Sequence, residues 1–97
     1  MFTYIALSNF TDQGIKTVKD TTQRAEAVKQ AGKKFGANMT QIYWTLGRYD
    51  VVAVIEAPDD ASATAFALAI GMSGNIRTQT LRAYTAAEMN TVLGKLV

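Results

Sequence analysis

The chain has 97 residues, of which 48% are hydrophobic and 19% are charged, and its formal net charge is +2. This length and balance predict one globular domain over residues 1–97 rather than two domains. Cysteine and histidine are both absent from the sequence, which excludes disulfides, cysteine or histidine catalysis and histidine-ligated metals. No carboxylate run resembles a calcium or magnesium loop, so we expect neither a metal nor a cofactor.

Location and macromolecular partners are constrained by the distribution of charge. The N-terminus has no basic stretch followed by an apolar core, so we expect no signal peptide and a cytoplasmic protein. The longest apolar run, residues 61–72, falls short of the roughly 20 residues that cross a bilayer, so no membrane partner is expected. Basic side chains gather on one predicted helix, and a solvated helix face explains them better than nucleic-acid binding because no exposed aromatic residues alternate with them. They are Lys16, Lys19, Arg24, Lys29, Lys33 and Lys34.

The N-terminal third of the chain predicts a strand followed by an interrupted helix. Residues 2–10 alternate in a way that is typical of a half-buried strand. Asp12 is expected to cap a first helical turn, and Asp20 is expected to begin a longer helix after a jog. Gly36 is well placed to end that helix in the left-handed conformation.

Residues 41–58 predict two strands joined by a very short turn. Gly47-Arg48 fits a two-residue hairpin loop with glycine first, because a type II′ turn requires positive φ at that position. One face of this hairpin carries almost only apolar residues, so Trp44 and Leu46 on that face are expected to face the core. The expected pairs are Thr45 with Asp50, Trp44 with Val51, Tyr43 with Val52, Ile42 with Ala53, Gln41 with Val54, and Met39 with Glu56.

The next helix is expected over residues 60–73, capped by Asp59, and it is apolar nearly all round. No charged residue occurs between Ala61 and Ile76, so a second face of this helix must be covered. The cover is either another subunit or the C-terminal segment 86–97, which could fold over its own helix or a neighbour's. The inner stripe is Phe66, Ala67 and Ile70, and the candidate oligomer contact is Ala65, Leu68, Ala69 and Met72.

A last strand over residues 76–84 completes a strand, helix, strand, strand, helix, strand order. This order predicts an α+β protein of ferredoxin-like βαββαβ fold, in which two helices cover one face of a four-stranded antiparallel sheet. The other face stays open and is too apolar to remain wet, which indicates a cavity or an assembly surface. The open face is expected to hold Tyr4, Ala6, Ser8, Gln41, Tyr43, Thr45, Asp50, Val52, Val54, Glu56, Thr78, Thr80, Arg82 and Tyr84.

Three separated segments, residues 46–50, 56–60 and 74–84, resemble the GYD domain family. The glycine, tyrosine and aspartate of the family signature are Gly47, Tyr49 and Asp50 here, and the resemblance extends over almost the whole chain. It implies a dimeric α+β barrel, in which two ferredoxin-like sheets close on each other through their open faces. The family brings no agreed activity and no catalytic residue.

Polar residues gather at both ends of the expected barrel. At the turn end, Asp50 either lines a small polar pocket or only accepts hydrogen bonds that hold the strand end. At the opposite end, Glu56 and Arg82 are expected to form a salt bridge or, alternatively, a charged pair that faces a ligand. The candidate pocket residues are Tyr4, Ser8, Tyr43, Thr45, Asp50, Glu56, Thr78, Arg82 and Tyr84.

These observations predict a small homo-oligomer that binds a small molecule in the cavity between paired sheets. Two other hypotheses stay open at this point. One is a cofactor-independent enzyme, similar to some oxygenases and isomerases, that would rely on Tyr, Asp, Glu or Arg groups with shifted pKa values. The other is a self-assembling structural protein that uses its apolar second helix. The sequence leaves the ligand, and the existence of any reaction, undetermined.

Overall fold

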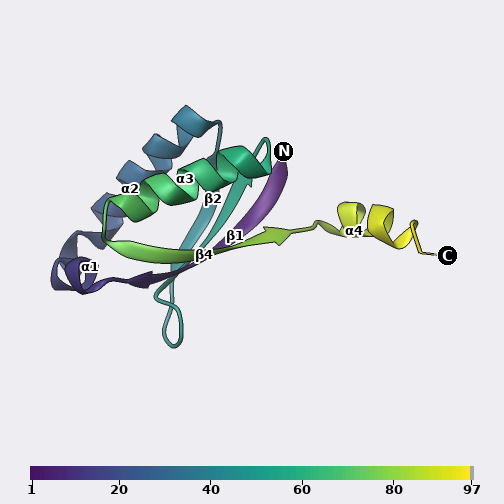
Figure 1. Ribbon diagram of the computed structural model, residues 1–97. Coiled ribbons are helices and arrows are strands. Elements are labelled where there is room, and N and C mark those ends of the chain that lie inside the picture. The colour runs from purple at the N-terminus through teal and green to yellow at the C-terminus, as the bar shows by residue number, and fades with distance from the viewer. Residues whose placement is uncertain (97) are drawn as a thin grey trace.

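The computed structural model describes residues 1–96, and its body is one sheet with helices packed on it (Figure 1). The elements are β1 (Phe2–Phe10), α1 (Asp12–Lys16), α2 (Thr21–Gly32), β2 (Asn38–Trp44), β3 (Val51–Ala57), α3 (Asp60–Met72), β4 (Ile76–Ala83) and α4 (Ala86–Leu93). The four strands are antiparallel and lie in the order β2-β3-β1-β4. The ferredoxin-like α+β fold that the order of elements predicts is therefore confirmed.

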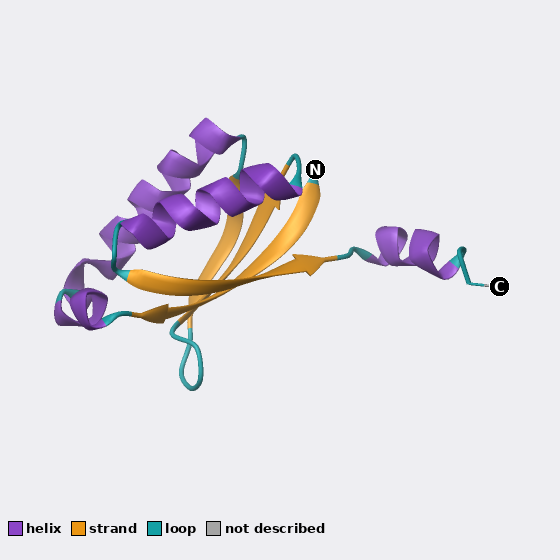
Figure 2. Ribbon diagram, in the orientation of Figure 1, coloured by secondary structure: helices purple, strands orange, loops and turns teal. Residues whose placement is uncertain are grey.

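Helices α2 and α3 lie on the same face of the sheet and leave the other face open (Figure 2). Helix α4 continues from the end of β4 and extends away from the body (Figure 1). Its start is a complete capping box, because the Thr85 hydroxyl accepts a hydrogen bond from the Glu88 backbone while the Glu88 carboxylate accepts one from the Thr85 backbone. No helix within residues 1–96 is long and apolar enough to cross a membrane.

The face of β1 that the helices cover differs from the expectation. Tyr4, Ala6 and Ser8 are buried under the helices, whereas they were expected on the open face. The strand carries apolar residues on both sides, so alternation alone cannot say which side the helices cover. The residues of β4 that are paired with them lie on the same covered face, namely Thr78, Thr80 and Arg82. The open face instead includes Thr3, Ile5, Leu7, Val52, Val54, Glu56, Gln79 and Leu81.

The predicted ladder between β2 and β3 is correct near the loop and wrong at its far end. Pairs from Trp44 with Val51 to Gln41 with Val54 are confirmed. A bulge at Thr40 then shifts the register, so that Met39 pairs with Ile55 and not with Glu56. The shift places Met39 in the core cluster of buried side chains.

The connection between these strands is a loop over residues 45–50, and the expected two-residue turn is wrong. The Thr45 backbone N–H donates to the Asp50 carbonyl at 2.8 Å. This bond joins the first and last residues of the loop, directly after the Trp44–Val51 pair that ends the ladder. Gly47 has a φ of +121°, so the position does require glycine. Leu46 is fully exposed rather than in the core. Trp44 is also only partly covered, with 41% of its surface exposed and its indole N–H donating to the Thr21 hydroxyl at 3.0 Å.

The helix ends follow local rules, with one correction. The cap of α1 is Thr11 and not Asp12, because the Thr11 hydroxyl accepts the Gly14 backbone N–H at 3.0 Å. A 3₁₀ turn over Val18–Asp20 separates α1 from α2, which confirms the expected jog. Gly36 ends the second helical segment with a φ of +70°, and Asp59 caps α3, both as expected.

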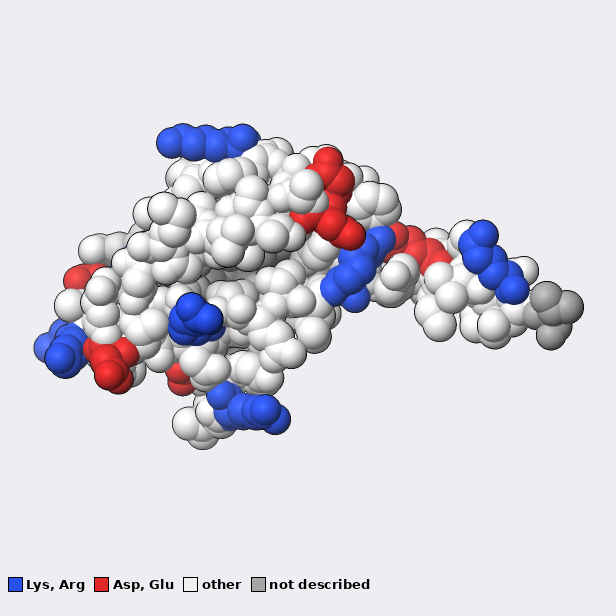
Figure 3. Space-filling view, viewed as in Figure 1, with Lys and Arg blue, Asp and Glu red and all other residues white. Residues whose placement is uncertain are grey.

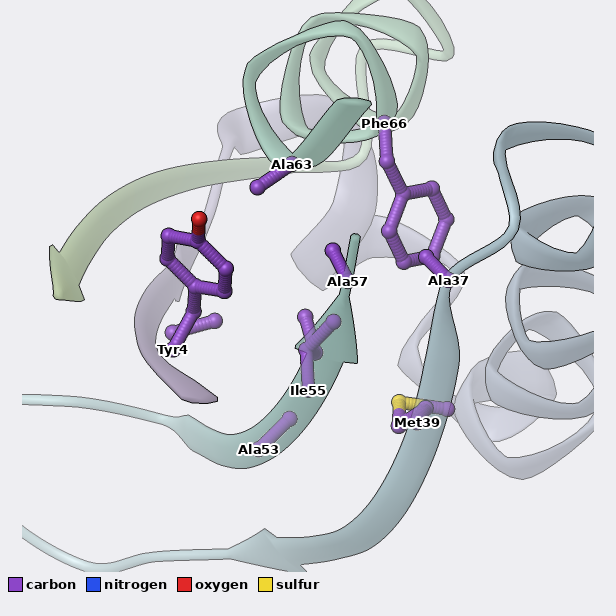
Figure 4. Close-up of a cluster of buried hydrophobic side chains, with 9 residues drawn as sticks. Tyr4, Ala37, Met39, Ala53, Ile55, Ala57, Ala63 and Phe66 are labelled. Carbon is purple, nitrogen blue, oxygen red and sulfur yellow. The ribbon is translucent and has the colours of Figure 1, made fainter. Parts of the chain in front are cut away.

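The core lies between α3 and the covered face of the sheet. Phe66 points from α3 toward Ala37 and Ala57, and all three are almost fully buried (Figure 4). The Phe66 ring stacks on that of Phe35, with ring centroids 5.9 Å apart. Many of the other buried side chains are alanines, so one large aromatic ring supplies much of the packing and leaves space elsewhere under the helices.

Candidate functional site

A cavity of about 90 Å³ lies between the covered face of the sheet and helices α2 and α3. Small side chains from three elements leave this room, among them Ala6 on β1, Ala53 on β3 and Ala67 on α3. The surface of the molecule is hollowed below α3 and above β4, and most of the atoms around the hollow are uncharged (Figure 3). The lining is mainly apolar, which is typical of ligand pockets.

Several polar side chains line the cavity, and two of them, Ser8 and Thr78, form a pair of hydroxyls. The oxygens of Ser8 and Thr78 lie 2.9 Å apart, within hydrogen-bond distance. Arg24 also lines the cavity, but its guanidinium donates to the Thr17 carbonyl and hydroxyl and to the Gly14 carbonyl. The arginine therefore fastens α1 to α2 through three hydrogen bonds and keeps its positive charge.

Tyr4 closes one end of the cavity with its hydroxyl group satisfied inside the protein. The hydroxyl donates to the Asp60 carboxylate at 2.5 Å. Burial, and then the hydrogen bond to Asp60, raise the pKa of Tyr4 to about 12. The phenol therefore stays protonated throughout the neutral range and can donate a hydrogen bond but not act as a base there.

The raised pKa of Tyr4 predicts a loss of stability at high pH. An unfolded tyrosine ionises at its ordinary pKa of 10.0, whereas folded Tyr4 holds its proton up to about 12. The stability that this group contributes is complete below pH 10 and is lost as the pH rises toward 12. We expect the melting temperature of the wild type to fall in this range more than that of Tyr4→Phe. Tyr84→Phe removes an exposed hydroxyl and should follow the wild type, whereas equal declines in all three proteins would contradict the assignment.

Asp50 holds the loop that precedes β3 against β1. Its carboxylate accepts the Phe10 backbone N–H at 2.9 Å and lies 3.5 Å from the Asn9 amide nitrogen, while its own backbone N–H donates to the Ser8 carbonyl. This arrangement supports the structural interpretation of Asp50 over a polar pocket. The side chain of Ser8 points to the covered face, so it does not join Asp50.

The expected salt bridge between Glu56 and Arg82 is wrong. Glu56 is paired with Thr3 on the open face, whereas Arg82 is paired with Tyr4 on the covered face. Arg82 instead bonds to Glu88 of α4 at 3.4 Å. Its guanidinium also lies 4.5 to 5.7 Å from the ring centroids of Phe2, Tyr4 and Tyr84. These contacts orient the start of α4 as it leaves the body.

The candidate pocket residues thus divide among separate regions. Tyr4, Ser8 and Thr78 line the internal cavity. Tyr43 and Glu56 belong to the open face, Thr45 and Asp50 to the loop, and Arg82 and Tyr84 to the junction with α4. The cavity-lining alanines were missed, because a small apolar residue on a strand gives the same sequence signal whether it packs or leaves space.

The outer face of α3 is uncovered among the described residues. Leu68 and Met72 expose 64% and 86% of their surfaces. Helix α4, which was one candidate cover, extends away from the body instead (Figure 1). Its own apolar side chains Met89 and Leu93 are likewise exposed.

The sheet topology defines a small ferredoxin-like α+β protein with a mainly apolar cavity between its sheet and its helices. Over residues 4–93 the sequence matches the GYD domain. The chain belongs to the GYD domain family, as the motifs around Gly47, Tyr49 and Asp50 predicted.

Two similar proteins come from Thermus thermophilus. A "glutamine synthetase and cystathionine beta-lyase binding protein" is 36% identical over 90 residues, which cover 92% of this chain and 95% of the relative. The crystal structure of TTHA0845 superposes with a TM-score of 0.57 at 23% identity, covering 89% of this chain and 96% of that one. The structural likeness concerns the fold alone.

Proposed function

We propose that this protein binds a small molecule in the cavity beneath α2 and α3. The observation that carries the proposal is the mainly apolar cavity itself, which the Ser8 and Thr78 hydroxyl pair also lines. This position differs from the space between paired sheets that the sequence favoured. The change follows from the orientation of β1, which turns Tyr4 and Ser8 toward the helices.

Filling the cavity tests this proposal directly. Ala67→Leu adds three carbons toward the cavity, so we expect it to abolish ligand binding while stability is kept or rises slightly. Ala27→Leu is the matched control, because Ala27 is exposed on α2 and does not line the cavity. The measurement is a thermal-shift screen of a metabolite library, since a ligand that prefers the folded state raises the melting temperature. A shift that survives in Ala67→Leu would place the ligand elsewhere.

We also propose that two copies associate through their open sheet faces. Ile5, Leu7, Val52 and Val54 form the centre of that face, and paired sheets with such side chains pack about 10 Å apart. The corrected orientation of β1 makes this face more apolar than the sequence indicated, which supports association. The cavity beneath the helices stays separate from such an interface.

The outer face of α3 is proposed as a further contact between copies. Burial of Leu68 would contribute roughly 1.5 to 3 kcal/mol, and Leu68→Glu would place an unpaired charge in the contact. We expect light scattering to show that this variant drops from a higher assembly to a dimer with its fold intact. Ala27→Glu, at an exposed position on α2, should leave the mass unchanged. A wild type that already runs as a dimer would contradict this contact.

Binding to metabolic enzymes is a second candidate function, and the similar Thermus protein favours it by the partners in its name. The similarity covers nearly the whole of both chains, so the surfaces used by that protein have counterparts here. Co-elution of this protein with the glutamine synthetase and cystathionine β-lyase of its own organism tests this candidate. Separate elution of both enzymes at micromolar concentration would contradict it.

A further inference from the structure

The buried hydroxyl pair in the cavity has hydrogen-bonding capacity to spare. Ser8 and Thr78 occupy directly opposite positions on β1 and β4, and Ser8 is only 4% exposed. Two hydroxyl groups carry two hydrogens, and the bond between them uses one. Within residues 1–96 this bond is the only one that either hydroxyl makes. One O–H donor is therefore left for a ligand.

The rest of the lining does not favour an ion. Among the described residues that line the cavity, Arg24 is the only charged one, and its donors are engaged by Thr17 and Gly14. The Tyr4 hydroxyl is engaged by Asp60. A cation would meet no counter-charge, and an anion would meet only the guanidinium that these bonds hold against α1. Either ion would lose its hydration shell to a mainly apolar lining.

We propose that the cavity takes a small uncharged molecule, largely apolar, that presents one carbonyl or hydroxyl oxygen to the Ser8–Thr78 pair. This inference rests on the proposed function and names the chemical class of its ligand. An apolar cavity of about 150 Å³ is known to hold benzene, and the space here is about 90 Å³. The class is therefore that of short ketones, short alcohols and five-membered rings, with the oxygen directed toward the sheet.

Three probes separate the contributions of shape, hydrogen bonding and charge. Xenon enters apolar cavities without hydrogen bonding, cyclopentanone adds one acceptor oxygen, and butyrate adds a negative charge. Titrations followed by amide NMR shifts should place xenon and cyclopentanone at cavity residues such as Ala53 and Ala67. Butyrate should cause no shifts there. Butyrate that binds as tightly as cyclopentanone would overturn the ligand class.

The variant Ser8→Ala/Thr78→Val removes both hydroxyls together and keeps the shape of the pair, so the fold is expected to persist. We expect its affinity for cyclopentanone to fall roughly ten-fold, the effect of losing one hydrogen bond, with xenon binding unchanged. Unchanged affinity for cyclopentanone would overturn the role of the hydroxyls. The proposed function would still stand if a library compound bound the wild type and not Ala67→Leu. Failure of xenon and of every library compound to reach the cavity would overturn both.

Discussion

Leu7→Glu, introduced together with Leu68→Glu, is expected to convert the remaining dimer into a monomer. Leu7 lies near the middle of the open sheet face, opposite Val52 on β3 and Gln79 on β4. The substitution removes the burial of a leucine, worth roughly 1.5 to 3 kcal/mol, and buries an unpaired carboxylate in the interface. A combined loss of about 4 kcal/mol weakens a dimer roughly a thousand-fold. Light scattering at micromolar concentration should then report the monomer mass.

The control for this prediction is a charge at a position that faces solvent. Ala27 is exposed on α2, on the other side of the sheet, so Ala27→Glu together with Leu68→Glu should remain dimeric. Circular dichroism should show the same secondary structure for both variants, because the covered face and its core are untouched. A wild type that is monomeric at this concentration would remove the case for association through the open face.

The fold could be predicted from local signals that each identify one element. Helix-capping rules predicted three helix ends, and all three are confirmed. They are the start of α3 at Asp59, the end of the segment after α2 at Gly36, and the start of α4 at Thr85 with Glu88. The order of elements then specifies the topology. The hairpin register was predictable only up to the bulge at Thr40, because an extra residue in one strand leaves no mark in an alternating pattern.

The candidate site was harder to predict than the fold, because it depends on which face of β1 the helices cover. With Tyr4 and Ala6 on one side of the strand and Ile5 and Leu7 on the other, both orientations bury apolar surface. The choice follows from tertiary packing, in which Tyr4 reaches Asp60 at the start of α3. Because the helices cover the other face of β1, Ser8 and Thr78 line the cavity. For the same reason Arg82 forms its salt bridge with Glu88 and not with Glu56.

Gly14→Ala is expected to destabilise the protein strongly, although it adds only one methyl group. A Cβ atom at this position would lie 1.9 Å from the backbone oxygen of Asn75 and 2.8 Å from its carbonyl carbon. Both contacts are with backbone, so either α1 or the loop before β4 must move. Overpacking typically costs about 1 to 3 kcal/mol, and a clash with backbone that cannot rotate away belongs at the upper end. In a domain of this size the melting temperature should then fall by about 10 °C or more.

Gly71→Ala provides the control, because a Cβ atom there meets nothing within 4 Å. Gly71 lies inside α3, where alanine is the better helix former, so the melting temperature should hold or rise slightly.

The movement forced by Gly14→Ala would also reach the proposed site. Gln13 on α1 donates to the Ser73 carbonyl and the Asn75 side chain, and both of these loop residues line the cavity. We therefore expect whatever folded Gly14→Ala protein remains at low temperature to bind cavity ligands more weakly than Gly71→Ala. A melting temperature close to that of the wild type would mean that α1 does not pack against this loop in solution, and the cavity would then lack the end wall that the loop supplies.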